Sequence, residues 1–148
     1  MVEFKNILFP VDLSETSPKL VPYVRTMAEK FGSKIHLLFV ARIFDYFSTI
    51  HVPSDSINKL EKDLVQGAKK RLAEFKDKYF QANAVVSAVV VPGDASEVIL
   101  NYTRSEQIDM IVLGTHGRKG LDKIVFGSVA ERVTRAAPVP VLLVNPHR

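Results

Sequence analysis

The chain has 148 residues, of which 47% are hydrophobic and 24% are charged, and these values are ordinary for a globular domain. It contains no cysteine, which excludes disulfides, thiolate catalysis and cysteine-based zinc sites. The formal net charge of +4 is mild and bears on solubility more than on partners. The first residues carry no charged-then-apolar leader, and no apolar run approaches the length of a membrane span. We therefore expect one domain over residues 1–148, in a soluble, cytoplasmic protein that does not bind membranes.

The first part of the chain predicts two buried strands with a helix between them. Residues 6–11 form a continuous apolar run, which is typical of a strand buried on both faces. Apolar residues then recur at helical spacing over residues 20–31, and Gly32 ends that run. Within it, Pro22 predicts either an irregular first turn or a helix that starts later. Residues 34–40 predict the second buried strand.

A connection and a long helix follow. Residues 41–53 have no clear period but contain three aromatic side chains, which favours a partly packed connection or a lid. Residues 54–81 predict a long amphipathic helix. Its apolar stripe comprises Ile57, Leu60, Leu64, Ala68, Leu72, Phe75 and Tyr79. Its basic residues are Lys69, Lys70, Arg71, Lys76 and Lys78. Such a run can attract a polyanion but usually marks a solvated helix face, so we do not expect a nucleic-acid partner.

The second half of the chain repeats the strand–helix alternation. Residues 84–91 and 108–113 predict the third and fourth strands, and Asp94 with Glu97 indicates a helix start between them. A helix after Gly127 ends before two prolines, and Val141–Val144 predicts a fifth strand. This order predicts an α/β fold, a doubly wound five-stranded parallel sheet with helices on both faces. Ligands of such sheets bind at the carboxyl ends of the strands, where the strand order reverses.

Glycines mark the end of the fourth strand, the loop after it and the start of the next helix. A Gly-rich turn that leads into a helix leaves several backbone N–H groups without intrahelical partners, which suits a phosphate or a carboxylate. Alternatively, Ser128 and Glu131 have capping-box spacing, which would satisfy two of these groups without a ligand. Asp12 follows the first strand. If the fourth strand lies beside the first, Asp12 and the glycine loop face the same crevice.

Three familiar phosphate-binding patterns are absent. The turn after the first strand lacks the G-x-G-x-x-G fingerprint of dinucleotide-binding proteins, and the P-loop pattern G-x-x-x-x-G-K-[ST] does not occur. A phosphoacceptor receiver domain would need an acidic cluster, whereas only Asp12 is well placed.

Gly114-x2-Gly117-x9-Gly127-Ser128 resembles the ATP-binding signature of the universal stress protein family, G-x2-G-x9-G-[ST], with every spacing intact. Residues 7–12 and 138–144 look like the first and last strands of that family. Leu13 departs from the many members that have glycine there, although other members carry an apolar residue. The resemblance covers essentially the whole chain, and it implies a Rossmann-like fold of the adenine nucleotide alpha hydrolase type.

The resemblance also implies a role for each matching position. The Asp12 carboxylate would accept hydrogen bonds from ribose hydroxyls; a local turn or helix cap is the alternative. The backbone of Val40 would contact adenine, and Leu113 would pack against the base, although residues of these types are more often core. The implied site for ATP, accompanied by Mg²⁺, comprises Pro10, Val11, Asp12, Val40, Leu113, Gly114, Gly117, Gly127, Ser128 and Val129.

The charged residues near the glycine signature do not indicate fast catalysis. Phosphoryl transfer needs charge neutralisation around the leaving group and a positioned nucleophile. Arg118, Lys119 and Lys123 are near in sequence but lack the fixed placement of a P-loop lysine, and His116 reads as a loop histidine without a catalytic role. We therefore assign no catalytic residue and no protein-bound metal.

Three functions stay open at this point. The favoured one is an ATP-binding regulatory switch with at most slow hydrolysis, which the resemblance implies is a homodimer paired through Val141–Val144. An exposed edge strand as apolar as this one would otherwise be a liability. The alternatives are a nucleotide-independent dimeric interaction module, which the intact glycine spacing disfavours, and a genuine ATPase or autophosphorylating protein.

Overall fold

Strands and helices alternate along the chain in the computed structural model, which describes residues 1–42, 54–81, 83, 85–115 and 127–147. The elements are β1 (Asn6–Pro10), α1 (Ser17–Phe31), β2 (Lys34–Ala41), α3 (Ser54–Tyr79), β3 (Val85–Pro92), α4 (Ala95–Ser105), β4 (Met110–Gly114), α5 (Ser128–Ala136) and β5 (Val141–Val144). All five predicted strands are confirmed, with ends that agree to within two residues. The predicted lid falls mostly outside the described residues.

The strands form one parallel sheet in the order β3-β2-β1-β4-β5. Strand β1 lies at the centre, where Ile7 pairs with Ile35 of β2 on one side and with Met110 of β4 on the other. The chain moves outward from β1 in one direction and then returns to the other side of it. The strand order therefore reverses between β1 and β4, and the predicted neighbourhood of the first and fourth strands is confirmed.

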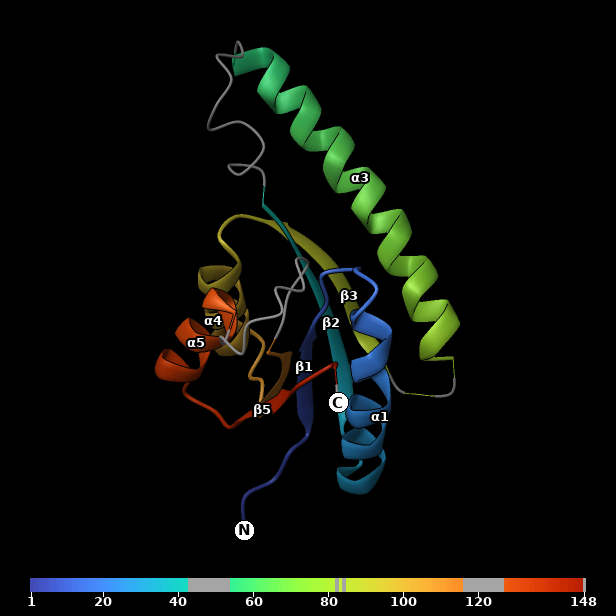
Figure 1. The fold of residues 1–148 in the computed structure, drawn as a ribbon, viewed down its shortest axis with the longest axis vertical. Helices are drawn as coiled ribbons and strands as arrows, with labels where there is room; N and C mark the ends of the chain where they lie inside the picture. Colours follow the sequence, from blue (N-terminus) through green and yellow to red (C-terminus); the bar gives the residue numbers. More distant parts are fainter. Residues whose placement is uncertain (43–53, 82, 84, 116–126, 148) are drawn as a thin grey trace.

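Both faces of the sheet are covered, as the doubly wound prediction requires. Helices α1 and α3 lie on one face and α4 and α5 on the other (Figure 1). Successive side chains of β1 point to opposite faces of the sheet, as they do in any strand. Ile7 and Phe9 pack with α1 and α3, whereas Leu8 packs with α4 and α5. This two-sided burial explains why β1 reads as a continuous apolar run.

The apolar stripe predicted for α3 packs only in its C-terminal half. Ala68 and Leu72 are buried, but the side chains of Leu60 and Leu64 remain 42% and 39% exposed. The N-terminal half of the helix projects beyond the end of the sheet (Figure 1). Helical spacing alone therefore identified the correct face of α3 but not the point at which its support ends.

Helix α1 begins earlier than Pro22 suggested. It starts at Ser17, so the predicted later start is wrong, whereas the predicted irregular first turn is present. The Lys19 N–H donates to the Thr16 carbonyl, three residues back, which is the tighter 3₁₀ pattern. Pro22 then removes one further helical hydrogen bond. The helix continues because its next turns pack on the sheet, and it ends at Gly32, whose φ of +62° suits glycine.

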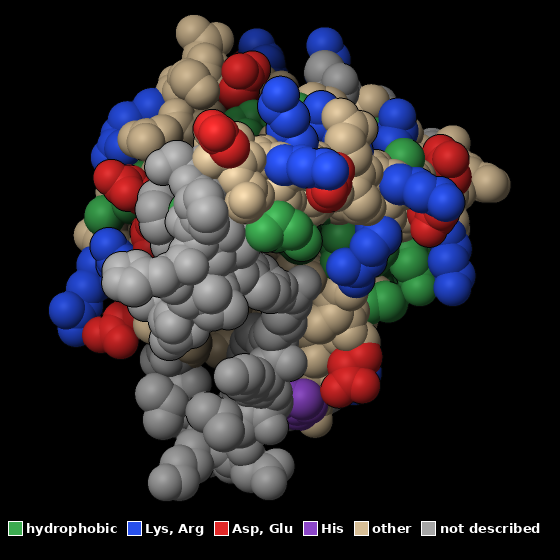
Figure 2. Space-filling model, turned by 90° about the horizontal axis from the view of Figure 1, so that it is seen from above, with side chains coloured by type: hydrophobic (Ala, Val, Ile, Leu, Met, Phe, Trp, Pro, Cys, Tyr) green, Lys and Arg blue, Asp and Glu red, His purple; other side chains and the backbone are tan. Residues whose placement is uncertain are grey.

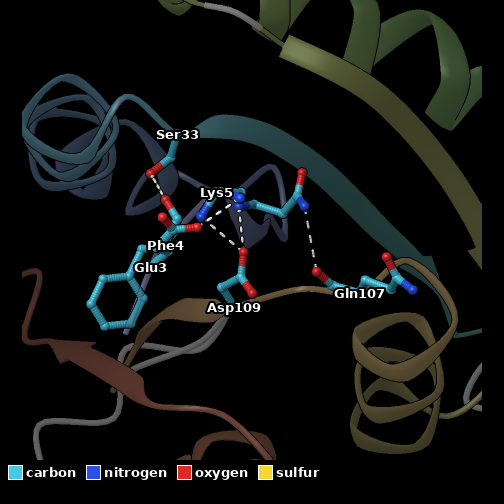
Figure 3. A network of polar contacts seen from close by, with 7 residues as sticks. Glu3, Phe4, Lys5, Ser33, Gln107 and Asp109 are labelled. Carbon is cyan, nitrogen blue, oxygen red and sulfur yellow. Dashed lines mark hydrogen bonds and ion pairs between the residues drawn. The ribbon is translucent and has the colours of Figure 1, made fainter. Parts of the chain in front are cut away.

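Asp109 ties the amino-terminal edge of the sheet together (Figure 3). Its Oδ2 accepts hydrogen bonds from the backbone N–H groups of Lys5 and Asn6, each at 2.8 Å. Next to this clamp, the Ser33 hydroxyl donates to the Phe4 carbonyl. The segment before β1 is thus fixed to both neighbouring strands at the edge opposite the predicted ligand site.

A buried polar cluster lies between the sheet and α4. His36 is 5% exposed, and its Nε2 lies 3.1 Å from Asn6 Oδ1 while its Nδ1 lies 3.2 Å from both Tyr102 Oη and Ser87 Oγ. Asn6 Nδ2 donates to the Gln107 carbonyl at 3.4 Å, which leaves Asn6 Oδ1 to accept from His36. These contacts assign a proton to Nε2, and in the neutral imidazole Nδ1 then accepts a hydrogen bond from a hydroxyl group.

Burial of His36 predicts an acid-labile fold. Desolvation lowers the pKa of His36 below its ordinary 6.5, so the unfolded chain binds a proton first as the pH falls. Stability is then fully present above about pH 6.5 and declines between that value and the lower pKa of the folded protein. We expect His36→Gln to flatten the decline in urea midpoint between pH 7 and pH 5. An unchanged slope in that variant would assign the decline to other groups.

Candidate functional site

A cavity of about 840 Å³ opens at the carboxyl edge of the sheet, beside the switch point between β1 and β4. We call it the main cavity. Its walls come from the ends of β1, β2 and β4, from the starts of α1 and α5, and from α3. The predicted site residues that line it are Pro10, Val11, Asp12, Val40, Leu113, Gly114, Gly127, Ser128 and Val129. Gly117, His116, Arg118, Lys119 and Lys123 lie outside the described residues.

The Asp12 carboxylate is held by the turn that follows β1. Its Oδ1 accepts from the Ser14 N–H at 3.0 Å, from the Ser14 hydroxyl at 2.6 Å and from the Ser17 hydroxyl at 2.7 Å. The local turn that we gave as the alternative role of Asp12 is therefore present. It uses one oxygen only, however, and within the described part of the chain no hydrogen bond reaches Oδ2. The turn fixes the carboxylate at the cavity wall and leaves an acceptor for a ligand.

Leu13 carries backbone strain beside this carboxylate. Its φ of +57° is in the left-handed region, which costs a non-glycine residue about 1–2 kcal/mol. Two contacts hold it there: its side chain packs against the core, and its carbonyl accepts a hydrogen bond from Arg71 Nη2 of α3 at 3.2 Å. Strain of this kind tends to occur at functional sites. Glycine would adopt this φ without that cost.

The start of α5 presents unoccupied amides to the main cavity. The N-cap is Gly127, with φ −51° and ψ 142°, and no side chain caps the helix. The predicted capping box of Ser128 and Glu131 is therefore wrong, because Ser128 is already the first helical residue. Glu131 instead pairs with Arg135 at 2.8 Å. The N–H groups of the first helical turn have no intrahelical partners, which is the geometry that favours an anion.

Hydrogen bonds between main-chain groups fix the two chain segments at the end of the main cavity where β4 ends and α5 begins. The Gly127 N–H donates to the Thr115 carbonyl at 2.8 Å, and the Thr115 N–H donates to the Val144 carbonyl at 2.9 Å. The end of β4 and the start of α5 are thus joined directly. The amides of α5 are positioned by backbone contacts and do not depend on a side chain.

Sequence reasoning missed the α3 wall of the main cavity. Asp63, Leu64, Gly67 and Arg71 line it, although the helical pattern indicated only a surface helix. Gly67 is the one signal in that stretch, because glycine in a helix interior costs about 1 kcal/mol relative to alanine. A Cβ added at Gly67 would meet nothing within 4 Å. Packing within the described chain therefore does not require glycine there.

A second, smaller cavity of about 170 Å³, which we call the side cavity, lies beside the main one. Its described lining consists of Arg42, Gly93, Asp94, Ala95, Ser96, Ser128, Val129 and Arg132. Four of these residues line both cavities, so the two spaces adjoin. Asp94 caps α4 by accepting from the Glu97 N–H at 3.0 Å, as the sequence predicted, and this bond lowers the pKa of its carboxyl.

Among the described residues there is no candidate metal site, and the face over the carboxyl ends of the strands is not uniformly basic. The residues that the structure describes hold no group of three histidine, cysteine, aspartate or glutamate side chains that would bind a metal ion. Seen from the carboxyl ends of the strands, the coloured surface mixes Lys and Arg with Asp and Glu (Figure 2). Among the helices described, none has both the length and the apolar character needed to span a bilayer.

A doubly wound parallel sheet with a cavity at its switch point defines an α/β protein of the Rossmann-like class. Within that class the chain belongs to the universal stress protein family, whose family model matches residues 3–145. The resemblance of the glycine signature and of the first and last strands is confirmed at the level of the family.

Known relatives agree with this assignment over nearly the whole chain. Universal stress protein MJ0531 of Methanocaldococcus jannaschii is 27% identical over 96% of this chain and 82% of its own. The solved structure of MJ0577, from the same organism, has a TM-score of 0.85 and 29% identity, and the match covers 97% of both chains. Universal stress protein UspA from Lactobacillus plantarum has a TM-score of 0.80 at 22% identity, over 98% of this chain and all of its own.

Proposed function

We propose that this universal stress protein binds ATP in the main cavity and acts as a nucleotide-dependent regulatory switch. The observation that carries the proposal is that nine of the ten residues chosen from sequence, on four separate segments, line one cavity. Its volume falls within the range of about 300–1,000 Å³ that ligand sites occupy. The start of α5, which no side chain caps, belongs to the same wall and carries the last glycine of the signature.

The nucleoside half of the ligand would lie over β1, β2 and β4. Asp12 Oδ2 would accept from the ribose hydroxyls, while its Oδ1 stays bound to the turn. Val40 and Leu113 lie at the ends of the strands on either side of β1 and would contact adenine through backbone and side chain, respectively. Burial of the base against the ends of these strands would supply much of the binding free energy.

The phosphates would lie against Gly114, Gly127 and the first amides of α5. Backbone N–H groups suit this role because they are already oriented by the helix and by the bond between Gly127 and Thr115. Gly117 would complete the cradle. We propose that Mg²⁺ enters with the nucleotide and is held mainly by phosphate oxygens and water, which is how this ion commonly binds.

Magnitudes favour a binding protein over a fast enzyme. A helix N-terminus contributes about 0.3–1 kcal/mol to an anion and up to ~2 kcal/mol when partly buried. A micromolar dissociation constant needs about 8 kcal/mol, so base burial and ribose contacts must supply most of it. Within the described chain, the main cavity is lined by no lysine and no histidine; its carboxylates are Asp12, which the turn after β1 holds, and Asp63 of α3. We therefore infer at most slow hydrolysis.

Two structural neighbours are consistent with nucleotide binding. A universal stress protein was solved in complex with cAMP, at 17% identity, and a family member from Arabidopsis thaliana with AMP bound, at 18% identity. These likenesses concern the fold, and the ligands are properties of those proteins. They support the choice of an adenine nucleotide as the first ligand to test.

The deciding experiment is calorimetry with ATP and Mg²⁺ on protein whose bound nucleotide has been identified. We expect the purified protein to carry ATP, or to bind it with a micromolar or lower dissociation constant. Denaturation followed by chromatography of the supernatant identifies any retained nucleotide. We also expect steady-state hydrolysis below about 1 s⁻¹, under the usual enzyme range. No binding would favour an interaction module, and faster turnover would favour an ATPase.

We propose in addition that the switch is a homodimer paired through β5. This strand is at the edge of the sheet, and its residues Val141, Leu142 and Leu143 are only half-buried although they are apolar. An uncovered edge of this kind invites pairing with a second chain. Cross-linking or sedimentation of the purified protein, with and without ATP, tests this part of the proposal separately.

A further inference from the structure

We propose that Arg42 and Arg132, in the side cavity, bind the terminal phosphates of the nucleotide and thereby make the protein prefer triphosphates to monophosphates. This inference rests on the function proposed above and adds a specificity determinant to the same site. It starts from the position of the side cavity. Ser128 and Val129, whose amides would hold phosphates, line both cavities. A phosphate chain anchored at these amides therefore has the side cavity as its neighbour.

The two arginines reach this space from different elements. Arg42 directly follows β2, two residues after Val40, and it lines both cavities. Its backbone neighbourhood is fixed because the Gly93 N–H donates to the Ala41 carbonyl at 3.0 Å. Arg132 lies on α5 four residues after Ser128, which places the two side chains on the same face of that helix.

The charge balance of the side cavity favours an anion. Its charged lining, within the described chain, is Arg42, Arg132 and Asp94. Hydrogen bonds from the Glu97 N–H and the Ser96 hydroxyl lower the pKa of the Asp94 carboxyl, and the charges of Arg132 and Arg42 lower it further. Two positive charges against one negative charge leave one positive charge uncompensated. A phosphate group would supply the missing negative charge.

The contacts within the side cavity leave the arginines available. Arg132 Nη1 lies 3.6 Å from Asp94 Oδ2, which is beyond hydrogen-bond length, and the Arg132 side chain is 65% exposed. Asp94 Oδ2 is already used by the Ser96 hydroxyl at 2.9 Å and by the Glu97 N–H. Arginine binds phosphate through two parallel hydrogen bonds, which are stronger than this loose ion pair.

The size of the side cavity suits a phosphate group and its water. Its volume of about 170 Å³ is more than ten times the roughly 10–15 Å³ that one water molecule needs. It is too small for a second nucleoside. An AMP molecule with its single phosphate at the α5 amides would leave this space to solvent. ADP and ATP extend beyond those amides, so only they gain from the arginines.

The test compares ATP, ADP and AMP by calorimetry in wild type, Arg42→Gln, Arg132→Gln and the double variant. We expect each single variant to weaken ATP binding about tenfold, as loss of a charged hydrogen bond does, and to change AMP binding by less than about twofold. Arg135→Gln is the matched control, because it removes the same charge from the same helix outside both cavities. It should leave the ratio of ATP to AMP affinity unchanged.

The outcomes separate this inference from the proposed function. If nucleotides bind but the ATP to AMP ratio is the same in wild type and the double variant, the arginine assignment is overturned and nucleotide binding stands. A purely structural role for the pair of Arg132 and Asp94 would lower the thermal midpoint without moving that ratio. Inorganic tripolyphosphate serves as a nucleoside-free probe. Its binding to wild type and loss in the double variant would support the anion site even if ATP failed to bind.

Discussion

Gly127→Val is expected to weaken ATP binding at least about 100-fold, which corresponds to roughly 2.7 kcal/mol. Gly127 is the N-cap of α5, lines the main cavity and lies next to the amides that would hold the phosphates. Its φ of −51° and ψ of 142° are open to any residue, so valine should not disturb the backbone. The valine side chain would occupy space that the phosphates need and would exclude the water that hydrates them. Calorimetry with ATP and Mg²⁺ measures it.

Two companion variants make this result specific. Gly127→Ala adds one carbon in place of three and should give an intermediate loss of affinity. Ala137→Val changes the residue at the other end of α5, where φ of −66° and ψ of 132° are nearly the same. It should leave ATP affinity unchanged. A folded Gly127→Val protein with wild-type affinity would show that the phosphates do not bind at this helix start.

Phe9→Ala is expected to lower the free energy of unfolding by about 3–5 kcal/mol, the range for truncation of a buried aromatic side chain. Phe9 is 1% exposed at the centre of the sheet. Its ring centroid lies 6.4 Å from that of Phe75 and 6.2 Å from that of Phe80, so it joins β1 to α3 and to the residue that follows α3. Urea unfolding, with an unchanged m value, measures the loss as a lower midpoint.

Phe31→Ala provides the matched control for stability. Phe31 also contacts an aromatic ring, that of Phe4 at 5.0 Å, but its side chain is 48% exposed at the end of α1. Its truncation should cost about 1 kcal/mol or less, because about half of its surface already faces water. Equal losses in the two variants would mean that the contact of β1 with α3 is not the stabilising feature we describe.

Period and composition were sufficient to predict the architecture. The apolar runs of β1 and β2 predicted buried strands because both faces of each strand are covered, and alternation with helices then fixed a parallel sheet. The same reasoning brought Asp12 and Gly127 to one crevice from positions 115 residues apart. The predicted neighbourhood of β1 and β4 followed from chain topology and needed no knowledge of side-chain contacts.

Other features depend on tertiary contacts that a single sequence does not display. The pattern S-x-x-E at Ser128 matched a capping box, but the helix begins one residue earlier because Gly127 is tied to Thr115. Helical spacing placed Leu60 and Leu64 in the core, yet the sheet ends before it reaches them. Arg42 and Arg71 line the cavities because of the positions of β2 and α3 in the fold, which the sequence alone does not give.

The bond from the Gly127 N–H to the Thr115 carbonyl has a consequence for how this site tolerates change. Because the two anchor points are joined to each other, the number of residues between them can vary without displacing either one. The entropic cost of a longer connection grows slowly, by about 0.6 kcal/mol for each doubling of its length. Insertions between positions 115 and 127 should therefore leave the contact between the end of β4 and the start of α5 in place.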